Sequence, residues 1–342
     1  MEKFFYITAW SKEDPAGGIL TYTLEGKKLE QHGFSPLAMA GYLCFSPDGK
    51  RLYATGAREG AEGVAAFSIL PGGKLEFLNF RPSQGKSTCH CAVSPDGGFL
   101  YTANYSSSSF SEFALDGTGR VRELTRVITH TGTGPVTNRQ ECAHPHFVSI
   151  TPDGRFLAVT DLGNDTLFCY PYAPGKGIDP AGAVRTPVTP GRGPRHLLFA
   201  PGNIVYLVTE LGNTVISMKY ADGRFTFLDE ISLLPEGCVC ATNASAVRMS
   251  GDGRFIVATN RGFDSLVVIA VDGKGGMKHV QTTLSGGNSP RDVNFLPCGN
   301  VFAAANEFSD NIYFYDFDTE RGLLTPNGLK LTMPRPLCIT WR

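Results

Sequence analysis

Residues 42–56 read YLCFSPDGKRLYATG: an apolar run, a Ser-Pro-Asp-Gly turn and a second strand-forming run. An Asp-Gly step between two such runs predicts a β-hairpin. Related turns recur as SPDG at 94, TPDG at 151, APGN at 200, SGDG at 250 and LPCG at 296, at spacings of 48, 57, 49, 50 and 46 residues. A second Gly-rich turn follows in most units, as at residues 70–74 and 116–119. Units of this length with four strands each predict the blades of a β-propeller.

The number of blades depends on the two ends of the chain. The turns define six units, whereas residues 4–35 supply further strands with no inner strand before them. The terminal segment LCITWR, residues 337–342, resembles the inner strands, so we expect it to pair beside residues 4–9. A ring closed in this way has no long exposed sheet edge. We therefore predict an all-β fold, a seven-bladed β-propeller in a single domain over residues 1–342. The alternative, an array of β-sandwiches in two domains, does not explain a terminus that completes the first blade.

The composition argues against several classes of partner. With 31 basic and 32 acidic residues the formal net charge is -1, so no broad electrostatic surface favours nucleic acid or an anionic membrane. No apolar stretch approaches the roughly 18 residues that cross a bilayer, and residues 1–10 contain no signal-peptide cleavage site. The nine cysteines are interpreted as reduced thiols, which are typical of the cytoplasm. We expect a cytoplasmic monomer or weak dimer whose partner is a small molecule.

Aligning the turns places polar residues at one end of the ring. Nine residues after the second turn position stand Gly56, Asn104, Asp161, Glu210, Asn260 and Asn306. Six residues before it stand Gly41, Cys89, His146, Arg195, Ser245 and Arg291. A two-residue Asp-Gly loop would make these positions face each other, as Arg195–Glu210, His146–Asp161 and Arg291–Asn306. Both sets lie at the end opposite the turns, so we expect the ligand site at that mouth of the central channel.

Some of these residues also fit simpler structural roles. Asn104, Asn260 and Asn306 are typical of strand-end caps, and Arg195 with Glu210 could be a structural ion pair. A carboxylate at Glu210 or Asp161 adds charge that capping does not require. His90 and His196 fall one residue away from the channel-facing positions, so we expect them to pack between blades.

The motifs resemble those of the seven-bladed propeller lactonases, a family that includes propeller-type 6-phosphogluconolactonases and the fungal 3-carboxy-cis,cis-muconate lactonising enzyme. The matching segments are TANYSSSS (102–109), NRQECAHPH (138–146), DLGND (161–165), GPRHLLF (193–199), TELGNTV (209–215), NRGFDS (260–265) and SPRDVNF (289–295). The resemblance implies a cofactor-free lactonase site formed by His146, Arg195, Glu210 and Arg261. It is weaker at residues 105–109, where a serine run replaces a Gly-containing turn, and at Phe263, where a smaller or polar residue is usual.

Hydrolysis of a lactone requires an activated water and a group that holds the negative charge on the carbonyl oxygen. Glu210 and His146 are the candidate bases, and Arg195 is the candidate for the oxyanion. Arg261 or Arg291 suits an anionic group on the substrate, because a guanidinium matches phosphate and carboxylate geometry. Further candidates for substrate binding are Asn104, Asp161, His144, Arg139 and Asn260.

These assignments predict hydrolysis of a small anionic sugar lactone, with 6-phosphogluconolactone as the first candidate. A muconate-type lactonising cycloisomerase and a non-catalytic binding propeller are the alternatives, because propellers host all three kinds of function. The Cys-His clusters at 89–91 and 142–146 lack the C-x₂-C spacing of zinc sites. No dinucleotide fingerprint, Walker loop or GxSxG motif is present. We therefore expect neither a metal nor a cofactor.

Overall fold

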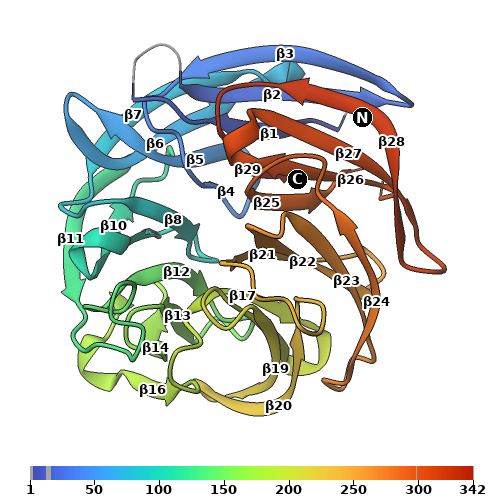
Figure 1. The fold of residues 1–342 in the computed structure, drawn as a ribbon. Coiled ribbons are helices and arrows are strands. Elements are labelled where there is room, and N and C mark those ends of the chain that lie inside the picture. Colours follow the sequence, from blue (N-terminus) through green and yellow to red (C-terminus); the bar gives the residue numbers. More distant parts are fainter. Residues whose placement is uncertain (1–2, 13–16, 298, 342) are drawn as a thin grey trace.

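The computed structural model describes residues 3–12, 17–297 and 299–341. These residues form seven β-sheets placed around a central axis (Figure 1). Each innermost strand contacts the next one all the way round the ring. The predicted seven-bladed β-propeller is therefore confirmed. Arg342, expected in the closing strand, and Cys298, expected as a reduced thiol, lie outside the described residues.

The innermost strands are β29 (Pro336–Trp341), β4 (Leu43–Phe45), β8 (Thr88–Val93), β12 (Pro145–Ile150), β17 (Pro194–Ala200), β21 (Asn243–Met249) and β25 (Pro290–Phe295). The second strands are β1 (Phe5–Ala9), β5 (Arg51–Arg58), β9 (Phe99–Asn104), β13 (Phe156–Asp161), β18 (Ile204–Thr209), β22 (Phe255–Arg261) and β26 (Val301–Asn306). The third strands are β2 (Gly18–Glu25), β6 (Ala61–Ile69), β10 (Ser109–Leu115), β14 (Thr166–Ala173), β19 (Thr214–Ala221), β23 (Ser265–Val271) and β27 (Asn311–Asp318). The outer strands are β3 (Lys28–Pro36), β7 (Leu75–Pro82), β11 (Val121–Thr129), β16 (Val184–Pro187), β20 (Arg224–Ser232), β24 (Met277–Leu284) and β28 (Leu323–Thr332), with β15 (Gly177–Ile178) added to the fourth sheet.

The helices in the described part of the chain are single 3-10 turns, too short to cross a membrane. They are η1 (Pro71–Gly73), η2 (Tyr105–Ser107), η3 (Pro180–Gly182), η4 (Pro201–Asn203) and η5 (Glu307–Ser309). Two of them, η2 and η5, directly follow the second strand of a blade. They therefore lie at the end of the ring where the ligand site is expected.

The repeated turn is stabilised by its own side chains. In the first copy, Ser46 Oγ donates to Asp48 Oδ1 at 2.6 Å, and the backbone N–H groups of Lys50 and Arg51 donate to Asp48 Oδ1 and Ser46 Oγ. Gly49 has a φ of 69°, in the left-handed region that glycine adopts without strain. The Ser/Thr-Pro-Asp-Gly sequence at residues 46, 94 and 151 therefore specifies the turn that joins the inner strand to the second strand in three of the blades.

The C-terminal strand closes the ring. Strand β29 pairs antiparallel with β1, placing Trp341 opposite Phe5 and Ile339 opposite Ile7. Phe5, Ile7 and Ile339 are buried in one apolar cluster together with Phe314 of the neighbouring blade. Closure therefore joins the two chain ends by backbone hydrogen bonds. It also completes the packing between the first blade and the last blade, which is formed by β25–β28.

The facing pairs predicted across the inner hairpins are wrong as backbone pairs. Pro145 pairs with Asp161 and Pro290 with Asn306, each one residue before the expected partner. Pro194 pairs with Thr209. The cause is a β-bulge in each inner strand, which adds one residue on that side and shifts the register. Equivalent bulges place four side chains at one level of four blades: Cys89, His146, Arg195 and Arg291.

Removing residues 337–342 should expose the edge of β1 and the apolar cluster around Ile7. We expect this truncation to lower the melting temperature by many degrees or to cause aggregation, because an unpaired strand edge is a site of association. Thermal denaturation and size-exclusion chromatography would measure both effects. A chain shortened only by Arg342 is the control. A truncation that melts within about one degree of the parent would show that closure contributes little.

Candidate functional site

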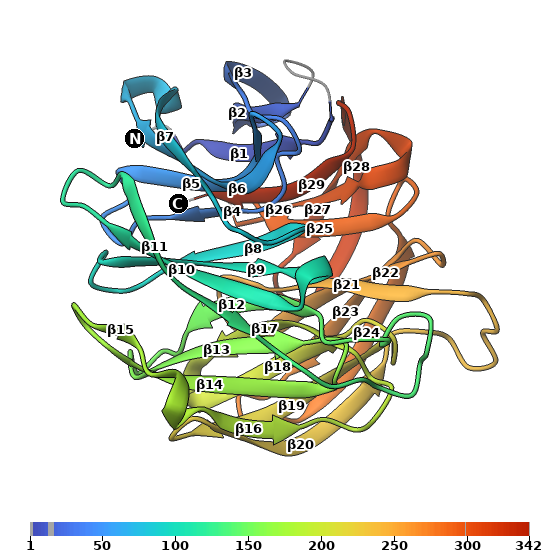
Figure 2. The ribbon, with the colours of Figure 1, turned by 90° about the vertical axis from the view of Figure 1, so that its left-hand side faces the viewer.

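Two long loops frame one end of the ring. Figure 2 shows the loop after β11 and the loop after β20 projecting from the same side of the molecule. Arg139 in the first loop donates from Nη1 to Asn243 Oδ1 at the end of the second loop, at 2.9 Å. Asp161 anchors the first loop, because its Oδ1 accepts from the His144 backbone N–H at 2.7 Å and its Oδ2 pairs with His130 Nδ1 at 2.7 Å. Arg139 and the bulged residues are therefore held at the same mouth.

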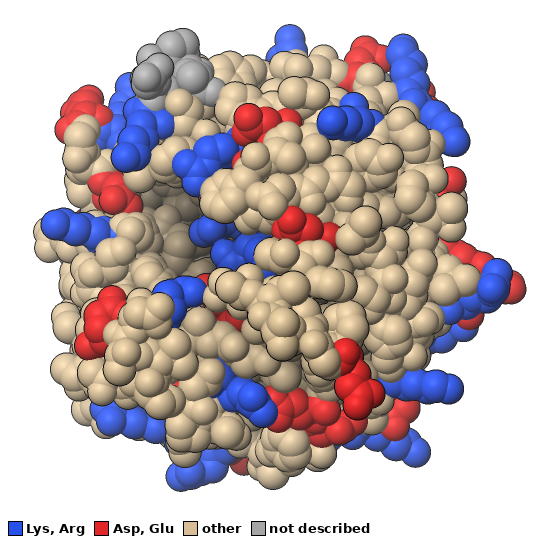
Figure 3. All heavy atoms as spheres, in the orientation of Figure 1, with Lys and Arg blue, Asp and Glu red and all other residues tan. Residues whose placement is uncertain are grey.

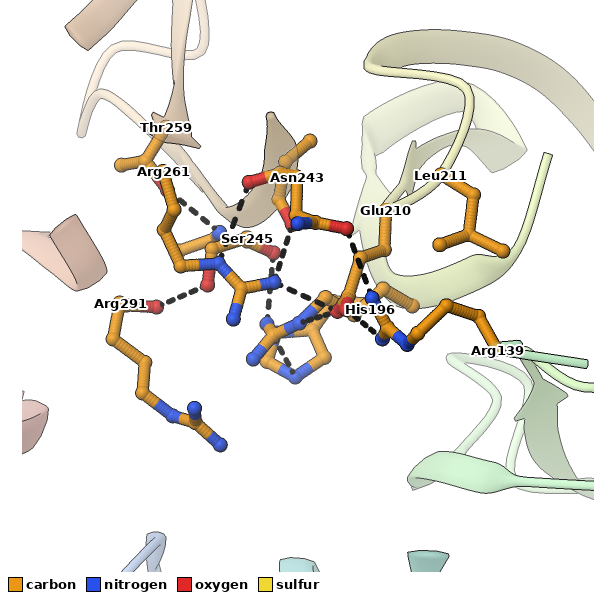
Figure 4. Close-up of polar contacts among 12 residues, drawn as sticks. Arg139, His196, Glu210, Leu211, Asn243, Ser245, Thr259, Arg261 and Arg291 are labelled. Carbon is orange, nitrogen blue, oxygen red and sulfur yellow. Dashed lines mark hydrogen bonds and ion pairs between the residues drawn. The ribbon is translucent and has the colours of Figure 1, made fainter. Parts of the chain in front are cut away.

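A single buried carboxylate, that of Glu210, gathers three guanidinium groups (Figure 4). Arg195 Nε and Arg261 Nη2 each lie 2.9 Å from Glu210 Oε2, and Arg139 Nη2 contacts Glu210 Oε1. Arg195 also donates from Nη1 to the Ser245 carbonyl at 2.8 Å. The side-chain contact predicted between Arg195 and Glu210 is therefore present, although the backbone pairing differs.

The three guanidiniums decide the protonation of Glu210. Burial acts to raise the pKa of this carboxyl, but Arg261 and Arg195 outweigh it and hold the pKa well below its ordinary value. Burial, followed by the nearby Arg261 charge, lowers the pKa of Arg195 to about 9, so that guanidinium still carries its charge at pH 7. The cluster therefore has three positive charges around one negative charge.

A second buried carboxylate, Glu307 at the start of η5, gathers two more guanidiniums. Arg291 Nη1 lies 3.2 Å from Glu307 Oε2, and Arg335 Nη2 contacts Glu307 Oε1. Burial acts to raise the pKa of Glu307, but Arg291 and Arg335 lower it below its ordinary value. The predicted contact of Arg291 with Asn306 is thus replaced by an ion pair with the next residue.

Three histidines lie together beside the Glu210 cluster. The ring of His196 is 5.2 Å from that of His146 and 5.3 Å from that of His90, and His90 packs on Tyr42 at 3.9 Å. Burial, and then the positive charge of Arg195 or Arg248, holds the pKa of all three imidazoles well below the ordinary value. His146 Nδ1 and His90 Nε2 are buried without a hydrogen-bond partner among the described residues. The rings are therefore neutral, and His146 has a nitrogen that no neighbour occupies.

A cavity of about 240 Å³ opens beside these clusters. In Figure 3 basic side chains gather around a hollow in this face of the molecule. The volume is somewhat below the roughly 300–1,000 Å³ of sites for drug-sized ligands, so it suits a smaller molecule. Its lining includes Trp10, Tyr42, Glu62, Cys89, Arg195, His196, Arg291, Asp292, Glu307 and Arg335.

The cavity lining itself holds three arginines and three carboxylates, and the excess of positive charge comes from the groups directly behind it. Two of its carboxylates are already engaged: Asp292 pairs with Arg248 at 2.7 Å, and Glu62 Oε2 accepts from the Thr88 N–H at 3.0 Å. Counting the lining and the groups directly behind it, six guanidiniums stand against four carboxylates: Arg139, Arg195, Arg248, Arg261, Arg291 and Arg335 against Glu62, Glu210, Asp292 and Glu307. An anionic ligand would offset the remaining positive charge.

Burial raises the pKa of the Cys89 thiol to about 12, so this cavity cysteine is not an activated nucleophile.

Several predicted substrate-binding residues have structural contacts. Asn104 Nδ2 donates to Ser111 Oγ at 2.9 Å, and Asn260 Nδ2 donates to Asn213 Oδ1 at 2.7 Å. Both side chains are fully buried, which matches the capping role. Asp161 is occupied by the loop that it anchors. Direct contact of these three residues with a substrate stays a prediction.

His144 belongs to a small cluster in the β11–β12 loop. Its ring stacks on Tyr105 at 4.2 Å, and its Nε2 lies 3.2 Å from Glu141 Oε1 and 3.7 Å from Cys142 Sγ. The three ligand atoms are within 4.8 Å of one another, a spacing that could hold a metal ion. Their direct contacts with one another account for the grouping without an ion. The expectation that the protein needs no metal stays a prediction.

Part of the cavity wall is formed by residues that the repeat does not predict. His196 packs between blades as expected, against Tyr42 and Phe147, but it also lines the cavity, which the sequence did not predict. His90 packs between blades as well, against Tyr42 and Phe147. Trp10 and Arg335 lie outside the repeated turn motif, and only ring closure brings them to the site. Glu307 could have been suspected, because it directly follows the aligned position of Asn306.

The buried histidines predict a loss of stability in acid. Their folded pKa values lie below the unfolded value of about 6.5, so below that pH only the unfolded chain takes up the protons. The free energy of unfolding should be highest above the unfolded pKa and should fall as the pH decreases. One pH unit below that pKa, the loss should be up to about 1.4 kcal/mol per histidine. Urea unfolding at several pH values would measure the slope.

The variant His90→Gln should make this pH dependence shallower, whatever it does to stability at neutral pH. The exposed His279 provides the matched control, because its replacement by Gln removes a histidine without removing a buried one. An unchanged slope in His90→Gln would contradict the assignment.

Comparison with known proteins places this chain in a family. The family model described as "Lactonase, 7-bladed beta-propeller" matches residues 4–341. The chain is 32% identical over 330 residues to 6-phosphogluconolactonase of Bacillus subtilis (strain 168). This alignment covers 94% of this chain and 93% of that protein. It is 28% identical to 6-phosphogluconolactonase of Formosa agariphila, over 93% of this chain and 94% of that protein. The structure of the periplasmic gluconolactonase PpgL of Pseudomonas aeruginosa superposes with a TM-score of 0.93 and 27% identity, over 100% of this chain and 99% of that chain. The protein therefore belongs to the family of seven-bladed β-propeller lactonases.

Proposed function

We propose that this protein hydrolyses a sugar lactone, with His146 as the general base and Arg195 as the group that holds the oxyanion. One observation carries the proposal: the buried neutral imidazole of His146, whose Nδ1 has no partner among the described residues, packs against His196, and His196 contacts the charged Arg195 guanidinium at the cavity wall. A base must be unprotonated at working pH. A preorganised cation stabilises charge only where it does not have to move. Both conditions are met by residues on neighbouring inner strands.

The reaction follows from these two roles. His146 takes a proton from water, and the oxygen adds to the lactone carbonyl carbon while negative charge moves to the carbonyl oxygen beside Arg195. Collapse of this intermediate breaks the bond between the carbonyl carbon and the ring oxygen. The imidazolium returns its proton to that oxygen, which leaves as a hydroxyl group, and the carboxylic acid formed at the other end releases its proton to solvent to give a carboxylate. Neither a cofactor nor a covalent intermediate is required.

Glu210 is less suited to the role of base. Its two oxygens already accept from Arg139, Arg195 and Arg261, and its pKa is well below the ordinary value. Its role in this proposal is to hold Arg195 and Arg261 in place, as the buried partner of both.

The substrate that we propose is 6-phosphogluconolactone. Two relatives that share about the whole chain are named 6-phosphogluconolactonase, and the excess of guanidiniums over carboxylates at and directly behind the cavity suits a phosphorylated ligand. We also propose a cytoplasmic location, since a phosphorylated sugar is an intracellular metabolite and the sequence is typical of a reduced compartment. The similar gluconolactonase PpgL makes the unphosphorylated lactone the natural competitor in an assay.

Purified protein should be assayed against 6-phosphogluconolactone, gluconolactone and carboxymuconolactone, with spontaneous hydrolysis subtracted. Acid release from the first substrate well above background supports the proposal. Interconversion of the muconolactone with its open-chain diene acid would instead identify a cycloisomerase. Binding of lactones without turnover of any of them would identify a non-catalytic propeller.

Replacement of His146 by Ala should lower kcat by about 10²–10⁴-fold, the usual contribution of a general base. Added imidazole should restore part of the lost rate, because the deleted side chain leaves room beside Arg195. The exposed His279→Ala is the control and should keep parental kinetics with no response to imidazole. A His146→Ala enzyme with parental kcat would overturn this assignment.

Replacement of Glu210 by Gln should reduce both activity and stability. The amide keeps the shape but leaves three guanidiniums around an uncharged group, and loss of one partner in a buried ion cluster typically costs about 3–5 kcal/mol. We expect a lower melting temperature together with a lower kcat, measured by thermal denaturation and steady-state kinetics. A large loss of kcat with an unchanged melting temperature would instead support Glu210 as the base.

A further inference from the structure

We infer that Arg335 and Arg291, held by the shared carboxylate of Glu307, form a two-guanidinium clamp that binds the phosphate of the substrate. This inference rests on the proposed function and assigns the specificity for a phosphorylated lactone to the seam where the ring closes. The clamp is separate from the Glu210 cluster, which holds the groups proposed to carry out the chemistry.

The geometry leaves donors of both arginines available to a ligand. Glu307 accepts one contact from each guanidinium, on opposite carboxylate oxygens. In Figure 4 the Arg291 guanidinium makes no contact with the other side chains drawn. Arg335 Nε is buried and has no hydrogen-bond partner among the described residues. A guanidinium has five N–H groups, so each arginine retains donors after its contact with Glu307.

The position of Arg335 is fixed by its backbone and by aromatic packing. Its N–H donates to Asp310 Oδ1 at 2.9 Å, and its carbonyl accepts from the Trp10 N–H at 3.2 Å. Its guanidinium lies 4.2 Å from the centre of the Trp10 ring and 5.6 Å from that of Phe308. These contacts hold a long, flexible side chain in one place, which reduces the entropy lost when it binds a ligand.

Charge and location point to a phosphate as the ligand. Two guanidiniums share one carboxylate, so the clamp keeps a net positive charge, and both line the same cavity as Arg195. Arginine forks match the oxygens of a phosphate bidentately. A substrate with an oxyanion at Arg195 and a phosphate at the clamp would span the cavity and supply an anion to each cluster.

The first test compares two substrates in Arg335→Gln and Arg291→Gln. We expect KM for 6-phosphogluconolactone to rise about tenfold or more in each variant, with kcat for gluconolactone near the parental value. Arg335→Lys should lose part of the effect, because it keeps the charge without the fork. The double variant should lose less than the product of the single losses if both arginines bind one phosphate. Arg155→Gln, which removes an exposed arginine paired with Asp222, is the matched control and should change neither substrate.

The second test is independent of catalysis. Calorimetric titration of the parent with 6-phosphogluconate and with gluconate should show tighter binding of the phosphorylated acid, and Arg335→Gln should abolish that difference. Equal losses on both substrates in folded Arg335→Gln, or an unchanged preference for 6-phosphogluconate, would overturn the clamp. A parent that hydrolyses no lactone would overturn the proposed function instead, and the titration would still decide the clamp.

Discussion

Pairing of β29 with β1 is the constraint on which the rest of this structure depends. It replaces two free sheet edges with a continuous ring and buries Ile7 and Ile339 between the first and last blades. It also brings Trp10, after β1, beside Arg335, before β29. The same backbone pairing that stabilises the propeller therefore builds one wall of the cavity. Stability and ligand binding are coupled at this seam.

The bulges have the complementary role on the inner strands. A regular ladder would alternate its side chains strictly between the two faces of each sheet. In four inner strands one extra residue interrupts that alternation at the cavity end, and it falls on Cys89, His146, Arg195 and Arg291. Bulges of this kind commonly re-aim side chains near active sites. A repeated local irregularity thus gives these blades different chemical groups at one level.

Two buried carboxylates organise the positive charge that results. Glu210 holds three guanidiniums and Glu307 holds two, so each cluster is stabilised by an anion and still remains positive. Buried charges are costly unless they are paired and hydrogen bonded. The arrangement therefore keeps the arginines fixed without neutralising them. It separates the group proposed for the oxyanion from the pair proposed for the phosphate.

The sequence by itself determined the seven blades, their closure by the C-terminal strand and the end of the ring that carries the site, because each follows from local turn chemistry and a regular period. It also identified Arg195, Glu210 and Arg291, which occupy aligned positions in the repeat. Only the tertiary structure decided the backbone register at His146, the place of His196 on the cavity, and the meeting of Arg335 with Trp10 and Glu307. A bulge has no sequence signal in a strand that otherwise alternates. Contacts across the seam join residues more than 300 positions apart, and the closed ring alone brings them together.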